Sequence, residues 1–161
     1  MLPPVLDVCC GSRMMWFDKD DGRGIFADTR RDIKAMDLGT PNTVGRSPAI
    51  VHPDVISDFT GMIFPDESFH LVVFDPPHLE TVGETGIIAF KYGKLPTNWK
   101  TMIQKGFDEC FRVLKQNGTL IFKWSEVEIP LKEILKLTDK KPLFGHRSGK
   151  KAKTHWCAFL K

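Results

Sequence analysis

Short apolar runs alternate with polar, turn-forming segments along most of this chain. The clearest run covers residues 69–74; it is continuous and contains two adjacent valines, which predicts a central strand buried on both faces and therefore a parallel sheet. Residues 99–115 place apolar side chains every three to four positions, the period of an amphipathic helix, and Asn117-Gly118 is expected to close that helix. Strands and helices that alternate in this way predict a doubly wound α/β sheet.

The same pattern predicts the remaining elements. A short helix or turn is expected at residues 12–19 and a helix at residues 130–137. Further strands are expected at residues 5–9, 24–27, 54–57, 119–124, 143–146 and 155–160, the last two as a closing antiparallel pair. Residues 37–53 and 79–98 are predicted to be long loops, and loops of this length are often functional.

The size and composition fit a single domain. The chain has 161 residues, of which 42% are hydrophobic and 27% charged, so one domain is expected across residues 1–161. Its four cysteines include one adjacent pair and no C-x-x-C spacing, which predicts reduced packing residues of a cytoplasmic protein, with neither disulfides nor a metal site. Because a basic leader and an apolar run of about 18 residues are both lacking, we expect no targeting signal and no membrane anchor.

Positive charge is concentrated near one end of the chain. The formal net charge is +3 and the sequence pI is near 8.7, which permits an anionic partner without identifying one. Residues 140–161 contain seven Lys or Arg and no Asp or Glu. This stretch either binds an anionic partner or forms a solvated basic face.

Candidate chemistry lies at the ends of the expected strands, because ligands bind at the carboxyl ends of an open parallel sheet. The first strand runs into Asp7, Cys9 and Gly11. Gly11 allows the backbone to approach a ligand closely, and Asp7 is suited to accept hydrogen bonds from an ammonium group or an ordered water. An ordinary glycine at a strand-to-turn junction is the alternative explanation.

Two further carboxylates follow the second and third expected strands. Asp28 lies seventeen residues after Gly11, near the spacing at which nucleoside-binding sheets place a carboxylate on the ribose hydroxyls. Asp58 is suited to accept from an adenine amino group while the Phe59 ring covers the adenine face. A structural cap on a turn or helix is the alternative for each carboxylate.

The most specific feature is Asp75-Pro76-Pro77-His78, directly after the most buried expected strand. Two consecutive prolines fix the backbone and remove two N–H donors, so the turn presents a carboxylate and a rigid carbonyl as paired acceptors. This pair suits an exocyclic amine, because accepting both hydrogens favours the tetrahedral, positively charged nitrogen that forms as it attacks a methyl group. His78 is expected to stack on a flipped base. A purely structural turn is the alternative.

These motifs resemble those of class I S-adenosylmethionine-dependent methyltransferases. Residues 6–12 resemble the first motif of that class, and residues 74–78 resemble the D/N/S-P-P-aromatic motif of amino-methyltransferases that act on adenine N6, cytosine N4 or guanine N2. Residues 64–73 resemble the lead into that motif, and residues 112–121 resemble the helix-to-strand junction of the class. The chain is also similar to small methyltransferases of phages and bacteria, and this similarity extends to residues 145–150 near the end of the sequence.

The resemblance implies a Rossmann-like, mostly parallel, seven-stranded sheet with an antiparallel C-terminal strand, and S-adenosyl-L-methionine as the cofactor. The residues it implies for cofactor binding are Asp7, Cys9, Gly11, Asp28, Asp58, Phe59 and Asp75. The implied catalytic residues are Asp75, Pro76, Pro77 and His78.

The reaction expected from these residues is methylation of an exocyclic amine of a base in DNA or RNA, with adenine N6 favoured. No separate target-recognition domain is expected, so phosphate contacts are assigned to Lys91, Lys94, Arg147, Lys150, Lys151 and Lys153. A small-molecule or protein methyltransferase and a non-catalytic cofactor-binding subunit are the alternatives, and a homo-oligomer or a partner subunit is compatible with each. A positive groove leading to Asp75 would favour the nucleic-acid methyltransferase. A closed apolar pocket would favour the small-molecule or protein methyltransferase, and an occluded cofactor cleft would favour the non-catalytic subunit.

Overall fold

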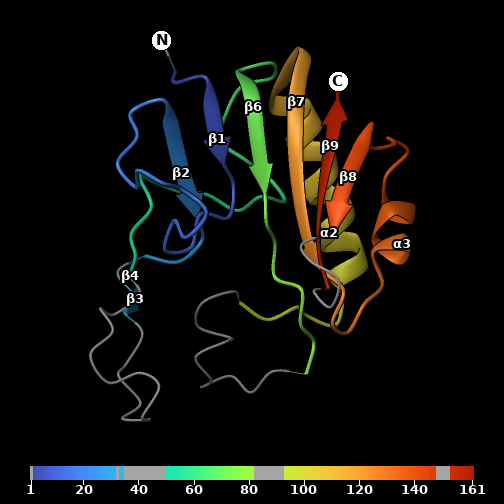
Figure 1. Ribbon diagram of the computed structural model, residues 1–161. Coiled ribbons are helices and arrows are strands. Elements are labelled where there is room, and N and C mark those ends of the chain that lie inside the picture. Colours follow the sequence, from blue (N-terminus) through green and yellow to red (C-terminus); the bar gives the residue numbers. More distant parts are fainter. Residues whose placement is uncertain (1, 32, 35–49, 82–92, 148–152) are drawn as a thin grey trace.

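Seven strands form one sheet in the order β5-β2-β1-β6-β7-β9-β8 (Figure 1). The structure is a computed structural model that describes residues 2–31, 33–34, 50–81, 93–147 and 153–161. The strands of the sheet are β1 (Val5–Asp7), β2 (Gly24–Asp28), β5 (Val55–Ile56), β6 (Phe69–Phe74), β7 (Leu114–Ser125), β8 (Phe144–Arg147) and β9 (Thr154–Leu160). Neighbouring strands from β5 to β7 are parallel, and β9 runs antiparallel to both β7 and β8. The predicted sheet, mostly parallel with an antiparallel C-terminal strand, is confirmed.

A second, two-stranded sheet was not predicted. It pairs β3 (Ile33–Lys34) with β4 (Ile50–Val51) in antiparallel register. Ile50 and Val51 lie in the segment predicted as a long loop. The pattern of apolar residues gives little warning of a strand of two residues, because period-2 alternation needs about four positions to be recognised.

The helical segments are α2 (Trp99–Val113), the short α3 (Leu131–Ile134) and the single 3-10 turn η1 (Leu135–Leu137). The prediction that Asn117-Gly118 closes the long helix was wrong. Leu114 already has extended backbone angles and pairs with Phe69, so the helix ends at Val113 and the glycine lies inside β7. There Asn117 has a φ of 63°, close to the point where the pairing of β6 with β7 shifts register. Residues 12–19 form turns without a helix.

The main core lies between α2 and one face of the sheet. Ile103 and Phe107 of α2 are fully buried, as are Phe74 and Phe122 of the sheet beneath them. Gly106 allows the two layers to come this close, because a Cβ there would lie 2.6 Å from Cζ of Phe74. Packing of α2 therefore fixes the end of β6, the residue directly before Asp75.

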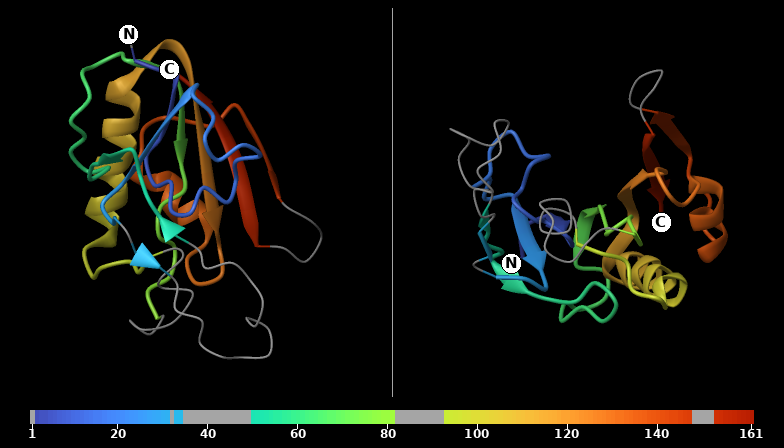
Figure 2. Two further views of the ribbon diagram at one scale, coloured as in Figure 1. Left: turned by 90° about the vertical axis from the view of Figure 1, so that its left-hand side faces the viewer. Right: turned by 90° about the horizontal axis from the view of Figure 1, so that it is seen from below.

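The opposite face of the sheet carries no helix of the described chain, and Figure 2 (right) shows α2 on one side only. Cross-strand pairing places ten residues of β6 to β9 on this open face: Leu71, Val73, Thr119, Ile121, Lys123, Phe144, His146, Trp156, Ala158 and Leu160. These residues alternate along their strands with those that pack against α2. At the β1–β2 end the face is covered, because the Trp16 ring packs edge-on against Phe26 and the guanidinium of Arg13 lies 3.8 Å from the Phe26 ring centre.

The cysteines serve packing, as predicted. All four are free, and Cys10, Cys110 and Cys157 are buried. Within the described ranges, no helix combines the length and the apolar character needed to cross a membrane.

Candidate functional site

A cleft of about 410 Å³ opens at the carboxyl ends of β1, β2 and β6, the lower edge of the sheet in Figure 1. This volume is within the usual range for small-molecule and cofactor sites. Six of the predicted cofactor residues line it together, namely Cys9, Gly11, Asp28, Asp58, Phe59 and Asp75. The ends of parallel strands thus meet as expected, and the cleft reaches from the first turn to the D-P-P segment.

The first turn and the end of β2 are joined by one buried hydrogen bond. The backbone N–H of Gly11 donates to Oδ2 of Asp28 at 3.0 Å. Gly11 has a φ of 50°, a left-handed conformation that glycine adopts without strain. Its lack of a side chain keeps this wall of the cleft close to backbone level.

Arg30 occupies both carboxylate oxygens of Asp28. Nε of Arg30 donates to Oδ1 at 2.9 Å, and Nη2 donates to Oδ2 at 3.0 Å. The backbone N–H of Arg30 also donates to Oδ1. The Asp28 carboxylate can accept from two donors at once, as a pair of ribose hydroxyls requires. In this structure the Arg30 guanidinium takes both of these hydrogen bonds.

The segment after β5 contributes Ser57, Asp58 and Phe59 to the cleft wall. The buried Ser57 Oγ has no hydrogen-bond partner among the described residues, which is rare for a buried hydroxyl, so it is free to bond a polar ligand or a water in the cleft. Oδ1 of Asp58 accepts from the N–H and the hydroxyl of Thr60, each at 2.8 Å. Phe59 is 9% exposed and packs edge-on against Phe74, so its ring belongs to both the core and the cleft.

Asp7 is fully buried and does not line the cleft. Its carboxylate accepts from Nε1 of Trp16 at 2.8 Å and from the backbone N–H of Cys9 at 3.3 Å. Burial raises the pKa of Asp7 to about 7, although both N–H donors act to lower it. The structure therefore assigns Asp7 to the support of the first turn.

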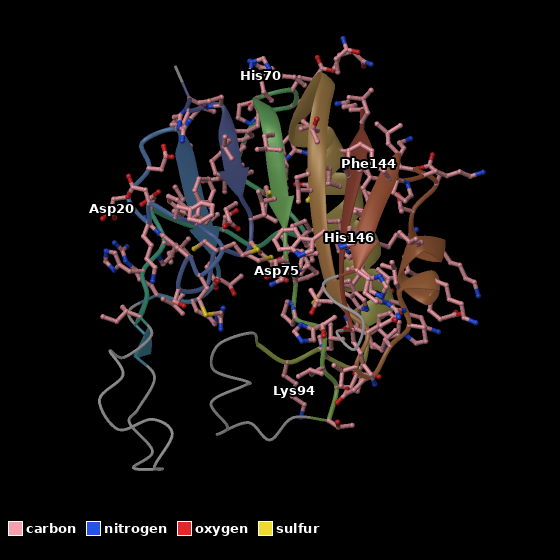
Figure 3. The ribbon with its side chains drawn as sticks, viewed as in Figure 1. Asp20, His70, Asp75, Lys94, Phe144 and His146 are labelled. Carbon is pink, nitrogen blue, oxygen red and sulfur yellow. The ribbon has the colours of Figure 1, made fainter. Side chains whose placement is uncertain are left out.

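Asp75 lies just beyond the end of β6 (Figure 3) and on the cleft. It is paired with Lys123 of β7. Nζ of Lys123 donates to Oδ2 of Asp75 at 2.6 Å. Burial raises the pKa of the Asp75 carboxyl above its usual value, and the adjacent ammonium offsets part of that rise. Among the described residues only Oδ2 is engaged, so Oδ1 remains available to accept a donor from a substrate.

The rest of the D-P-P-H turn is held by its neighbours. A Cβ on Gly93, which has a φ of 75°, would lie 3.0 Å from Cγ of Pro77, and the backbone N–H of Leu95 donates to the carbonyl of Leu79. These contacts place Lys94 on the cleft wall. Pro76 and His78 are not among the lining residues; the His78 ring lies edge-on to Trp124, with centroids 6.2 Å apart, and burial lowers its pKa. Its stacking on a base stays a prediction.

The sequence matches no protein-family model, and no curated protein matches it either. Solved structures do match. A TehB-like S-adenosylmethionine-dependent methyltransferase from Corynebacterium glutamicum superposes with a TM-score of 0.57 at 12% identity, over 98% of this chain and 79% of its own. A second S-adenosylmethionine-dependent methyltransferase, from Methanosarcina mazei, gives 0.54 at 16% identity, over 98% and 91%.

The chain has the fold of S-adenosylmethionine-dependent methyltransferases. A third match with this fold is the 1,6-didemethyltoxoflavin-N1-methyltransferase of Burkholderia thailandensis, solved with 1,6-didemethyltoxoflavin and S-adenosylhomocysteine. Its TM-score is 0.54 at 13% identity, over 98% of this chain and 70% of that one.

Arg30, Ser57 and Lys123 line this cleft and were not predicted as site residues from the sequence. Glu128, which contacts the segment after the D-P-P-H turn, was not predicted either. Glu128 anchors the segment after the D-P-P-H turn, because its carboxylate accepts from the N–H of Glu80 at 2.5 Å and from both the N–H and the hydroxyl of Thr81. A signal for Lys123 was present, since a lysine at position 123 interrupts the apolar strand predicted for residues 119–124.

The predicted phosphate contacts are only partly described. Lys94 lines the cleft, whereas Arg147 at the end of β8 donates to Oε1 of Glu126 at 2.8 Å. Lys153 directly precedes β9 and is exposed. Lys91, Lys150 and Lys151 lie outside the described residues. Nucleic-acid contact by these six residues stays a prediction.

Proposed function

We propose that this chain is an S-adenosylmethionine-dependent methyltransferase that acts on an exocyclic amine of a nucleic-acid base, with adenine N6 as the favoured position. The observation that carries the proposal is the position of Asp75 on the same cleft as Gly11 and Asp28. A fold alone does not define a reaction, so the case depends on these side chains.

The cleft residues fit the cofactor. Asp28 offers two carboxylate oxygens to two donors, and Gly11 leaves room beside the first turn. Ser57, whose Oγ has no hydrogen-bond partner among the described residues, belongs to the same cleft wall. When bound, S-adenosylmethionine supplies a methyl group carried on a sulfonium sulfur. The residues that would hold it are Gly11, Asp28, Ser57, Asp58 and Phe59, after Arg30 has moved away from the Asp28 oxygens.

Asp75 and Pro76 act on the amine that receives the methyl group. Oδ1 of Asp75 accepts one N–H of the amine. The second N–H is assigned to the carbonyl of Pro76, which is not among the cleft-lining residues and already accepts a hydrogen bond from the His78 ring. Acceptance of both hydrogens favours a tetrahedral nitrogen with an available lone pair. Lys123 is a positioning residue in this scheme, because its ammonium holds Oδ2 of Asp75 and offsets part of the rise in the carboxyl pKa that burial causes. The nitrogen would gain the methyl group as the methyl–sulfur bond of S-adenosylmethionine breaks, with S-adenosylhomocysteine as the leaving thioether. The methylated nitrogen would then lose its positive charge by releasing a proton to Asp75 or to water.

Substitution at Asp75 tests this role. Asp75→Ala should lower turnover by at least about a hundredfold, typical of deleting one oriented group from an electrostatic site, while the affinity for S-adenosylmethionine is retained. Asp75→Asn keeps one acceptor oxygen and should keep measurable activity. Turnover by both variants at the wild-type rate would show that the D-P-P turn is structural.

Methylation of a small heterocycle is the second candidate. The Burkholderia thailandensis structure with this fold holds such a molecule, 1,6-didemethyltoxoflavin. Arg30 and Lys123 on the cleft wall are paired with Asp28 and Asp75, so the preference for a phosphate-bearing substrate rests on Lys94. Assays that offer free nucleosides beside oligonucleotides separate the two candidates.

A further inference from the structure

A row of three side chains crosses the open face toward Asp75. His146 on β8 pairs with Trp156 on β9, and Trp156 pairs with Lys123 on β7. Nζ of Lys123 lies 5.7 Å from the centre of the Trp156 ring and 2.6 Å from Oδ2 of Asp75. Because neighbouring strands are about 4.8 Å apart, two aromatic rings lie within roughly 10 Å of Lys123.

The rings of this row are accessible. His146 is exposed, Trp156 is half-buried, and Phe144, two residues before His146 on the same face of β8, is 71% exposed. Figure 3, which looks onto the open face, shows Phe144 and His146 along β8, with Asp75 toward the middle of the sheet. Large apolar side chains gathered on an uncovered face usually mark an interaction surface.

Basic groups border the same rings. Residues 140–161, which include β8 and β9, contain seven Lys or Arg and no acidic residue. Arg147 ends β8 and Lys153 precedes β9, so both lie at the end of the hairpin that is nearer the cleft. Arg147 is paired with Glu126, whereas Lys153 forms no ion pair within the described residues. The surface therefore combines flat rings with a positive border.

We infer that the open face beside Asp75 is a stacking surface for single-stranded nucleic acid, on which Trp156, His146 and Phe144 hold the nucleotides that flank the target base. The inference rests on the proposed function and deepens it by naming a single strand as the substrate form. Aromatic side chains in a positively charged groove are how proteins bind single strands without reading their sequence. A base in a single strand also reaches the cleft without being drawn out of a duplex.

The continuity of the row with the cleft favours this occupant over a second copy of the chain. The proposed amine acceptor, Asp75, is next to the row formed by His146, Trp156 and Lys123. A partner that lies along this row therefore has one end at Asp75. A strand of nucleotides meets that geometry, because its flanking bases stack while the target base enters the cleft.

The experiment measures binding of fluorescently labelled single strands of about 12 nucleotides, as DNA and as RNA, by fluorescence anisotropy. The Phe144→Ala/His146→Ala double variant changes exposed side chains and should bind about tenfold more weakly or worse, as expected for loss of a stacked base. His70→Ala, an exposed histidine at the opposite edge of the sheet, is the matched control and should bind as the wild type does. Trp156→Phe should retain most of the affinity that Trp156→Leu loses.

Methyl transfer then separates this inference from the proposed function. For oligonucleotides the double variant should raise KM about tenfold with kcat little changed, whereas His70→Ala should change neither. Methylation of oligonucleotides with the same KM in the double variant would overturn the stacking surface and leave the proposed function intact. A wild type that neither binds nor methylates nucleic acid would overturn both. A dimer of the wild type that the double variant dissociates would show that a second copy covers the face.

Discussion

Replacement of Asp7 by asparagine should change how stability depends on pH. Asp7 is fully buried, and its burial raises the pKa of the carboxyl from 3.8 to about 7. The unfolded chain releases this proton near pH 4, whereas the folded chain keeps it until about pH 7. Between these values unfolding releases a proton, so the free energy of unfolding falls as the pH rises.

The size of this effect follows from the pKa shift. A rise from 3.8 to about 7 is about three pKa units, and each unit corresponds to about 1.4 kcal/mol. Asp7 should therefore contribute a loss of about 4 kcal/mol between pH 4 and pH 7, a large share of the 5–15 kcal/mol typical of a domain. The asparagine side chain of the Asp7→Asn variant does not titrate, so the variant has no such loss.

Urea unfolding at several pH values between 5 and 8 measures this directly. The free energy of unfolding of the wild type minus that of Asp7→Asn should fall steadily up to about pH 7 and then level off. Trp16→Phe provides a second arm: it removes the N–H donor that lowers the pKa of Asp7, so the fall should extend to higher pH. A difference between wild type and Asp7→Asn that is constant across this range would refute the reasoning.

Three further predictions concern the cleft and its support. Asp28→Ala should weaken S-adenosylmethionine binding, measured by calorimetry, about ten- to a hundredfold, as expected for loss of a charge-assisted pair. Arg30→Ala removes the competing guanidinium and should not weaken binding. Unchanged affinity in folded Asp28→Ala would remove Asp28 from the site. Lys123→Met should raise the pKa of Asp75 further, so the acid limb of the kcat/KM pH profile should move to higher pH. Lys123→Arg should return the acid limb to its wild-type position. An acid limb that does not move in Lys123→Met would contradict the pairing of Lys123 with Asp75. Gly106→Ala puts a Cβ 2.6 Å from Phe74 and should destabilise the protein by roughly 1–3 kcal/mol, whereas Gly61→Ala meets nothing within 4 Å; equal Tm values for the two variants would argue against the tight packing of α2 on Phe74.

The strands that carry the site could be predicted from the sequence because they are buried in a way that leaves a clear pattern. In Phe69–Phe74 the face against α2 is buried, and Leu71 and Val73 on the open face are half-buried, so every position except His70 is apolar. The expected burial on both faces was therefore wrong for the open face. The boundary after α2 could not be predicted. Asn117-Gly118 is compatible both with a helix end and with a positive φ inside a strand, and only the pairing of Leu114 with Phe69 decides between them.

The candidate site was predictable where it depends on strand order and not where it depends on side-chain partners. Gly11, Asp28 and Asp75 follow adjacent parallel strands, so their meeting at one edge follows from the sheet alone. The ion pairs of Asp28 with Arg30 and of Asp75 with Lys123 depend on side-chain orientation and cross-strand register, which apolar periodicity does not specify.

The most direct test of the central claim is nucleoside analysis after incubation with S-adenosylmethionine. The wild type and Asp75→Ala are incubated with unmodified single-stranded DNA and RNA, which are then digested to nucleosides and analysed by mass spectrometry. We expect an N-methylated nucleoside, N6-methyladenine as base, from the wild type and at most about one hundredth as much from Asp75→Ala. A wild type that binds S-adenosylmethionine but methylates no base, or that methylates bases equally well without Asp75, would contradict the account.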